Sequence, residues 1–276
     1  MSGTAVLAIV AVACAVLAGL LIPPWLRRQR RRRAQDETLP ELMRAAIARN
    51  VPAVAPLPAA ERRRLEGLVI AFLAEKTFVG CNGLEVTDEI RATIAAEACL
   101  LLLGRTQASL YDDLQSILVY PGAFWVEDEV HDDDGLVTRR RRELSGEAWD
   151  AQRVILSWED VVGSAEAATP GYNVVLHEFA HHLDAEGLGL ANPKRDAARW
   201  HAELMEEYER LCAAVDAGEE TWLDPYGAED ATEFFAVATE EFFECAPEMR
   251  EALPRLYALM RDFYGVDPAA WADARA

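Results

Sequence analysis

The spacing of apolar and polar positions predicts a chain built mainly from helices, with a few short strands. Apolar residues recur with a period of about 3.6 residues over Ala60–Lys76, Arg195–Ala214 and Ala231–Glu244. A further, nearly continuously apolar helix is predicted over Asp88–Leu103, with Thr87 as its N-cap.

Two short segments, Ser116–Tyr120 and Val154–Trp158, are rich in β-branched and aromatic residues and are bounded by proline, glycine or charge, as strands are. Between them, Val126–Arg142 has the composition of a polar hairpin or loop. It carries His131, for which an exposed loop position is expected, and the consecutive arginines Arg139–Arg142. We therefore expect a helix-dominated α+β domain in which helices pack on a small sheet.

The N-terminus carries an apolar run of eighteen uncharged residues, Ala5 to Ile22. A helix of this length spans about 27 Å, just enough to cross a bilayer core. A cleaved signal peptide or a lipoprotein site at Cys14 would normally have a basic start, whereas the first four residues carry no charged side chain. Six arginines follow the run within Arg27–Arg33. This combination favours a transmembrane anchor over residues 1–26.

The arginine cluster also predicts how the chain is oriented and where its domain begins. Because positively charged flanks stay in the cytoplasm, we expect a single-pass protein of the inner membrane with its main domain inside; without a true anchor it would be cytosolic. Residues 27–58 are expected to form a basic and proline-rich linker, with a short helix around Pro40–Asn50. The folded domain is then expected over residues 59–276.

Composition excludes some classes of protein. A formal net charge of −20 argues against direct binding to nucleic acid, which usually requires a basic face. The five cysteines are scattered and contain no CxxC pair, so neither a disulfide framework nor a thiolate metal site is indicated. Reduced thiols suit a domain that stays in the cytoplasm.

The segment His177–Asp184 (HEFAHHLD) carries the clearest chemistry. On a helix, His177 and His181 lie on one face and can bind one metal ion, and Glu178 lies beside them as a candidate general base. We predict that this helix begins at Thr169-Pro170, as N-cap and first position, and ends near Gly187. His182 projects about 100° away and is not expected to share the metal ion.

A catalytic zinc ion needs a third protein ligand, and the predicted helix Ala231–Glu244 offers candidates. Glu233 begins an acidic stripe, although it also fits a capping box with Asp230. Glu240, farther along the same stripe, is a rival ligand. Asp224 is a second rival ligand, because the segment in which an aspartate precedes Tyr-Gly resembles the ligand loop of aspartate-type zincins.

These residues carry a resemblance. The chain resembles the Mlc titration factor A family of zinc peptidases, whose catalytic region is similar to that of anthrax lethal factor. The matching segments span most of residues 60–265: Gly83–Ile90, Leu118–Pro121, Leu144–Trp149, Val154–Trp158, His177–His181 with Asp184, and Glu233–Val237. The N-terminal apolar run, the arginine cluster and the proline-rich linker depart from the family.

The resemblance implies a zincin-like fold with one Zn²⁺ bound by His177, His181 and Glu233. It also implies that Glu178 is the catalytic base and that Tyr226 is the active-site tyrosine. The expected activity is hydrolysis of peptide or protein substrates, similar to that of aminopeptidases, with a regulatory link to the Mlc repressor in enteric bacteria.

Two interpretations stay open at this point: a metallopeptidase, and a non-catalytic regulatory binding protein with a structural zinc ion. An intact Glu178 favours the first. Asp184 is either a hydrogen-bond acceptor for an imidazole or a charge at the helix end. His201 is expected on a helix, either at the surface or partly buried.

Overall fold

The structure is a computed structural model. It describes residues 37–105, 110–122, 124–131, 137–144, 146–150, 152–165, 171–185 and 196–274, together with residues 29, 31, 33 and 34. For residues 124–131, 137–144, 146–150, 164, 165 and 185 the description is confined to the backbone.

Helices make up most of the described chain, and the strands are short. The helices are α2 (Glu41–Asn50), α3 (Ala59–Glu75), α4 (Asp88–Leu100), α5 (Trp158–Ala165), α6 (Val174–Ala185), α7 (Ala197–Asp216), α8 (Ala231–Glu244), α9 (Ala246–Ala252), α10 (Pro254–Tyr264) and α11 (Pro268–Asp273), with 3-10 turns η1 (Pro52–Val54) and η2 (Pro225–Ala228). The strands are β1 (Thr77–Gly80), β2 (Ser116–Tyr120), β3 (Phe124–His131), β4 (Val137–Leu144), β5 (Gly146–Asp150) and β6 (Arg153–Ser157). This is a helix-dominated α+β fold.

Four strands form a sheet in the order β1-β2-β6-β5. β1, β2 and β6 are parallel, and β5 pairs with β6 in the antiparallel sense. Because side chains alternate along a strand, Ile117 and Val119 of β2 enter the main core. Leu118 and Tyr120 pack instead around Ile155 on the opposite face.

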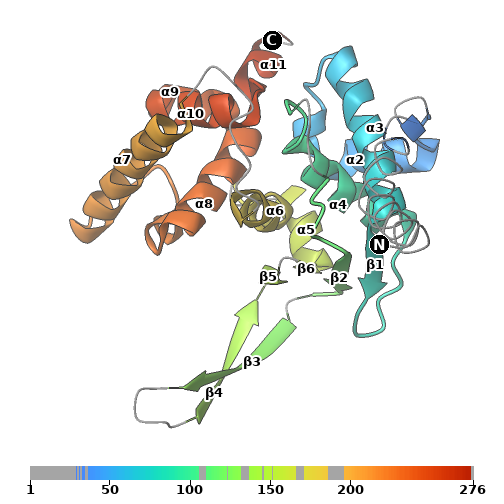
Figure 1. Ribbon diagram of the computed structural model, residues 1–276, viewed down its shortest axis with the longest axis horizontal. Helices are drawn as coiled ribbons and strands as arrows, with labels where there is room; N and C mark the ends of the chain where they lie inside the picture. The colour runs from blue at the N-terminus through green and yellow to red at the C-terminus, as the bar shows by residue number, and fades with distance from the viewer. Residues whose placement is uncertain are drawn as a thin grey trace, which may run out of the picture.

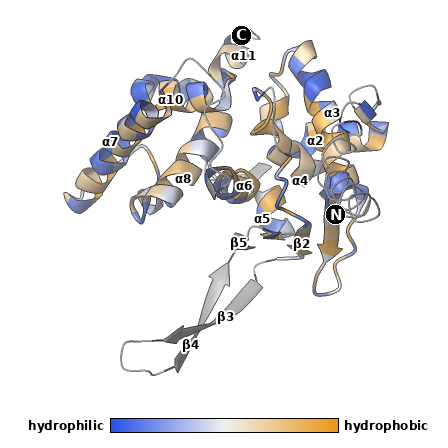
Figure 2. Ribbon diagram, viewed as in Figure 1, coloured by the Kyte–Doolittle hydropathy of each residue, from blue (hydrophilic) through white to orange (hydrophobic). Residues whose placement is uncertain are grey.

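Helix α6 lies at the centre of the molecule, with α4, α3 and α2 on one side and α8, α7 and α10 on the other (Figure 1). Its contacts explain this place, since α6 packs against α4, α8, β5 and β6. Apolar residues gather on α4 and α6, whereas hydrophilic and apolar residues alternate along α7 (Figure 2). The core therefore surrounds the helix that carries the His-Glu-x-x-His segment.

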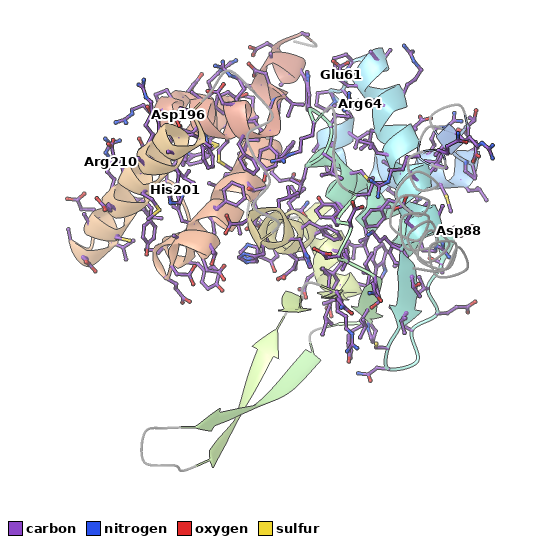
Figure 3. All side chains as sticks on the ribbon, viewed as in Figure 1. Glu61, Arg64, Asp88, Asp196, His201 and Arg210 are labelled. Carbon is purple, nitrogen blue, oxygen red and sulfur yellow. The ribbon has the colours of Figure 1, made fainter. Side chains whose placement is uncertain are left out.

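Most predicted elements are confirmed within a few residues. Thr87 caps α4, because its hydroxyl oxygen accepts a hydrogen bond from the backbone of Ile90, although α4 ends at Leu100 rather than at Leu103. Where a polar hairpin or loop was predicted, β3 and β4 pair in the antiparallel sense and project from the body of the molecule (Figure 1). His131 ends β3 and pairs with Val137. His201 is exposed on α7, as expected (Figure 3).

The predicted start of the metal-binding helix is wrong. Helix α6 begins at Val174, and the residue that caps it is Asn173, whose Oδ1 accepts hydrogen bonds from Val175 and Leu176. Thr169, Pro170 and Gly187 lie outside the described residues.

The boundary expected near Ala59 also differs from the structure, because the chain joins the core well before it. Leu39, Val51, Val54 and Leu57 are each at most 5% exposed and belong to the main hydrophobic cluster. The proline-rich stretch contains η1, in which Pro52 stands at the first position, where a missing N–H costs nothing. Residues 39–57 therefore pack as part of the domain rather than as a free linker.

The predicted anchor, Ala5 to Ile22, lies outside the described residues. Within the part of the chain that the structure describes, no helix combines the length and apolar character needed to cross a membrane.

Candidate metal centre

The apolar residues of helix α6 face the core, and this orientation of the helix about its axis turns the two histidines of the motif toward the partly exposed side. Val175, Leu176 and Phe179 are fully buried in the core. His177 and His181 lie one turn apart on the remaining side, with their Nε2 atoms 3.2 Å from each other and their ring centroids 4.8 Å apart. Both side chains keep some exposure, 13% and 20%.

Helix α8 brings Glu233 to the same point. The backbone N–H of Glu233 donates to Oδ1 of Asp230, so the predicted helix cap forms. The carboxylate does not complete a capping box, because its Oε2 lies 3.0 Å from Nε2 of His177 and 3.6 Å from Nε2 of His181. The structure therefore brings together the three residues predicted as ligands.

The three side chains fit a small metal ion. Nitrogen and oxygen ligands at about 2.0–2.1 Å from a tetrahedral ion lie about 3.3 Å from each other. The observed separations of 3.0, 3.2 and 3.6 Å among His177, His181 and Glu233 bracket this value. Among the described residues, this is the one group of three or more histidine, cysteine and acidic side chains whose atoms converge in this way.

Glu240 lies on the other side of the same imidazole. Its Oε1 is 2.8 Å from Nδ1 of His177, whereas the convergent group faces Nε2. Oε2 of Glu240 accepts a hydrogen bond from the backbone N–H of Asn173 at 2.5 Å. Glu240 is therefore placed to hold the ring of His177 rather than to bind the same ion.

The electrostatics of His177 reflect these two acids. Burial alone would lower the pKa of His177, but its hydrogen bonds to Glu233 and Glu240, together with the charge of Glu178, raise it to about 10. Burial likewise acts to raise the pKa of Glu233, yet its bonds to His177 and His181 hold it far below the ordinary value. In the metal-free protein, the ionised carboxylate of Glu233 therefore lies against a protonated imidazole of His177.

Glu178 and Tyr226 flank the histidines. Glu178 follows His177 on α6 and is only 6% exposed, and its charge helps to raise the pKa of His177. The ring of Tyr226 lies 6.1 Å from the ring of His177 and is 41% exposed. Tyr226 is held in η2 by Asp224, whose Oδ1 accepts from its backbone N–H. Asp224, weighed as a rival ligand, is thus a turn cap outside the convergent group.

Two other residues of α6 point elsewhere. The ring of His182 is buried and lies 6.1 Å from the ring of Phe179 and 6.5 Å from that of Tyr111, which agrees with its expected direction away from the ligands. Asp184 is exposed near the end of the helix.

Sequence reasoning missed Asn173. An asparagine directly before an apolar helical run is itself an N-cap signal, but Thr169-Pro170 offered a stronger one a turn earlier.

Comparisons with known proteins identify the family of the chain. Residues 25–265 match the model of the protein family described as "Glucose-regulated metallo-peptidase M90". An uncharacterised protein of Synechocystis is 35% identical over 269 residues, covering 94% of this chain and 97% of its own length. The Mlc titration factor A of Pectobacterium atrosepticum is 36% identical over 254 residues, covering 90% and 92%. That of Serratia proteamaculans is 35% identical over the same number of residues, covering 90% and 93%.

Two imidazoles from a His-Glu-x-x-His helix that converge with a glutamate from a second helix are the ligand arrangement of metallopeptidases. The matched length and the identities show which family this is. The chain belongs to the glucose-regulated metallo-peptidase M90 family.

Proposed function

We propose that the protein is a zinc-dependent metallopeptidase of the zincin-like class, which hydrolyses peptide bonds. The observation that carries this proposal is the convergence of His177, His181 and Glu233, with Glu178 next to His177 on α6. A purely structural zinc site is normally closed by four protein ligands and has no use for a neighbouring base.

Two imidazoles and one carboxylate suit zinc, which accepts nitrogen and oxygen ligands and leaves a fourth position open in catalytic sites. A zinc ion held by His177, His181 and Glu233 would act as a Lewis acid that makes water a better nucleophile near neutral pH. Glu240 supports the site, because a carboxylate that accepts from Nδ1–H of His177 fixes the tautomer and leaves Nε2 free for a metal ion.

The chain's own residues divide the remaining work. Glu178 takes a proton from the attacking water and delivers it to the leaving amine, so it is regenerated in each cycle. The hydroxyl of Tyr226 donates a hydrogen bond to the oxyanion that develops on the peptide carbonyl. Its exposed side chain in η2 leaves it accessible to a substrate.

The substrates we propose are peptides or proteins, with the aminopeptidase-like preference that the family resemblance implies. A regulatory role through an Mlc-like transcription repressor is supported by relatives named Mlc titration factor A. The same name supports an alternative function, a non-catalytic binding protein that sequesters such a repressor and uses zinc to hold its fold.

We also propose that Ala5 to Ile22 anchors the chain in the inner membrane, with the peptidase domain in the cytoplasm. The support is the apolar run followed by six arginines. Reporter fusions at the C-terminus test this: a cytoplasmic reporter should be active, and an active periplasmic phosphatase fusion would overturn the topology.

Metal removal and restoration test the proposed activity. The purified protein should cleave members of a peptide library, lose this activity on treatment with a chelator, and regain it with about one equivalent of Zn²⁺. Zinc binding without cleavage of any peptide would overturn the peptidase and favour the alternative.

A further inference from the structure

Asn173 caps the metal-binding helix from a buried position. It is 2% exposed, and its Oδ1 accepts from the backbone N–H groups of Val175 and Leu176 at 3.1 and 3.0 Å. These are groups that have no partner within a helix, so this contact fixes where α6 begins.

The same residue also connects α6 to two other helices. Its Nδ2 donates to Oε1 of Glu97 on α4 at 3.1 Å and to Oε1 of Glu244 on α8 at 2.9 Å. Its backbone N–H donates to Glu240 on α8. Both side-chain donors, the side-chain acceptor and the backbone donor of Asn173 are thus engaged.

This arrangement places three carboxylates around Asn173, two at its side-chain amide and one at its backbone N–H. Glu97 and Glu240 are 1% and 4% exposed, and burial raises the pKa of Glu97, Glu240 and Glu244. Burying acidic groups is costly unless they gain hydrogen bonds. Asn173 supplies a hydrogen bond to each of them.

We propose that Asn173 is a positioning residue of the metal centre, which acts through Glu240 on His177. This inference rests on the proposed function. One oxygen of Glu240 accepts from the backbone N–H of Asn173 and the other lies at Nδ1 of His177. The side chain of Asn173, bound to Glu97 and Glu244, fixes where that N–H lies and so orients Glu240 against the ring. Residues that hydrogen-bond to a metal-ligating histidine orient it and increase its basicity.

The substitution that isolates this role is Asn173→Ser. Serine is a good N-cap and keeps the backbone N–H, so the start of α6 is preserved. It lacks the amide that reaches Glu97 and Glu244, so α6 is no longer tied to α4 and α8 at this point. We expect Zn²⁺ to bind about tenfold more weakly, as measured by competition with a chromophoric chelator, and kcat to fall with little change in KM.

The matched control is Asn50→Ser. Asn50 is also buried, and its Nδ2 bridges Glu89 and Thr93 on α4 in the same manner, at 3.0 Å to each. It lies outside the metal centre, so its replacement should leave the zinc affinity unchanged. An equal loss of zinc affinity in both variants would assign the effect to a general loosening of the fold and overturn the proposal.

A double-mutant cycle with Glu240→Ala separates positioning from stability. If Asn173 acts through Glu240, Asn173→Ser should weaken zinc binding in the wild-type background and have little further effect once Glu240 is absent. Equal effects in both backgrounds would overturn the proposal.

Asn173→Asp provides a second variant in case the serine variant does not fold. It keeps the cap but places a carboxylate oxygen against Glu97 and Glu244, so zinc binding should weaken at least as much. Wild-type zinc affinity in the folded variants would overturn the positioning role alone. A wild-type protein that binds no zinc would refute the proposed function itself.

Discussion

At the scale of single residues, His177 is the most constrained group in the site. Each of its ring nitrogens faces a carboxylate, Glu233 at 3.0 Å and Glu240 at 2.8 Å. With its pKa raised to about 10 by these partners despite burial, the ring carries a proton in the metal-free protein at neutral pH. That proton supplies the positive charge which the two acids require.

Replacing Glu233 and replacing Glu240 should have different effects on zinc binding. We predict that Glu233→Ala lowers zinc affinity by about one to two orders of magnitude and abolishes hydrolysis, because two histidines alone rarely retain catalytic zinc. Glu240→Ala should be milder, since it removes only support for His177. Elemental analysis checks this, and a full zinc content in Glu233→Ala with loss in Glu240→Ala would reverse the assignment.

The sequence determined part of this site and left part open. His177, Glu178 and His181 lie within one helical turn, so their spacing alone places them together. The choice between Glu233 and Glu240 depends on how α8 packs against α6, because both lie on one stripe of the same helix. That packing is tertiary information, and local spacing does not contain it.

At the scale of elements, α8 carries both a ligand and a dense group of acids. Burial is the largest cause that raises the pKa of Glu241 from its ordinary 4.5 to about 7. A hydrogen bond with Cys245 acts in the opposite direction, and the charges of Glu240 and Asp224 add to the increase. The folded protein thus binds this proton more tightly than the unfolded chain. Ionised Glu241 therefore destabilises the fold progressively as the pH rises from about 4.5 to about 7, and the penalty persists above that range.

We predict that Glu241→Gln raises the thermal midpoint at pH 8 and changes it little at pH 5. Calorimetry of the metal-free protein at both pH values measures this difference. Glu209→Gln, on the exposed face of α7, is the control. A gain of the same size at both pH values, or an equal pH dependence in the control, would contradict the assignment.

Elements with a clear period were predictable, and those defined by distant contacts were not. The helices α3 and α8 follow from their apolar spacing. The start of α6 at Val174 depends on Asn173, whose partners Glu97 and Glu244 lie far away in the sequence. The packing of residues 39–57 was missed because prolines suggest a linker. Leu39 and Val51 flank α2, and α2 packs against α4, which lies far away in the sequence.

At the scale of the whole molecule, this packing changes where the domain can be shortened. We predict that a protein beginning at Thr38 is folded and active, and that one beginning at Ala59 is unfolded or aggregates. The longer deletion removes five buried apolar side chains, each worth about 1.5–3 kcal/mol, from a fold whose net stability is about 5–15 kcal/mol. The side chains removed belong to Leu39, Ile47, Val51, Val54 and Leu57. Circular dichroism and gel filtration check this, and a cooperatively folded Ala59 protein would contradict it.

The central claim is that this family member hydrolyses peptides with Glu178 as the base, and one variant tests it most directly. Glu178→Gln keeps the size of the side chain and leaves His177, His181 and Glu233 in place, so the variant should retain about one equivalent of zinc and the wild-type thermal midpoint. Hydrolysis should fall by about 10²–10⁴-fold, because no group remains to move the proton. Peptide cleavage at the wild-type rate by the zinc-loaded variant would contradict the mechanism.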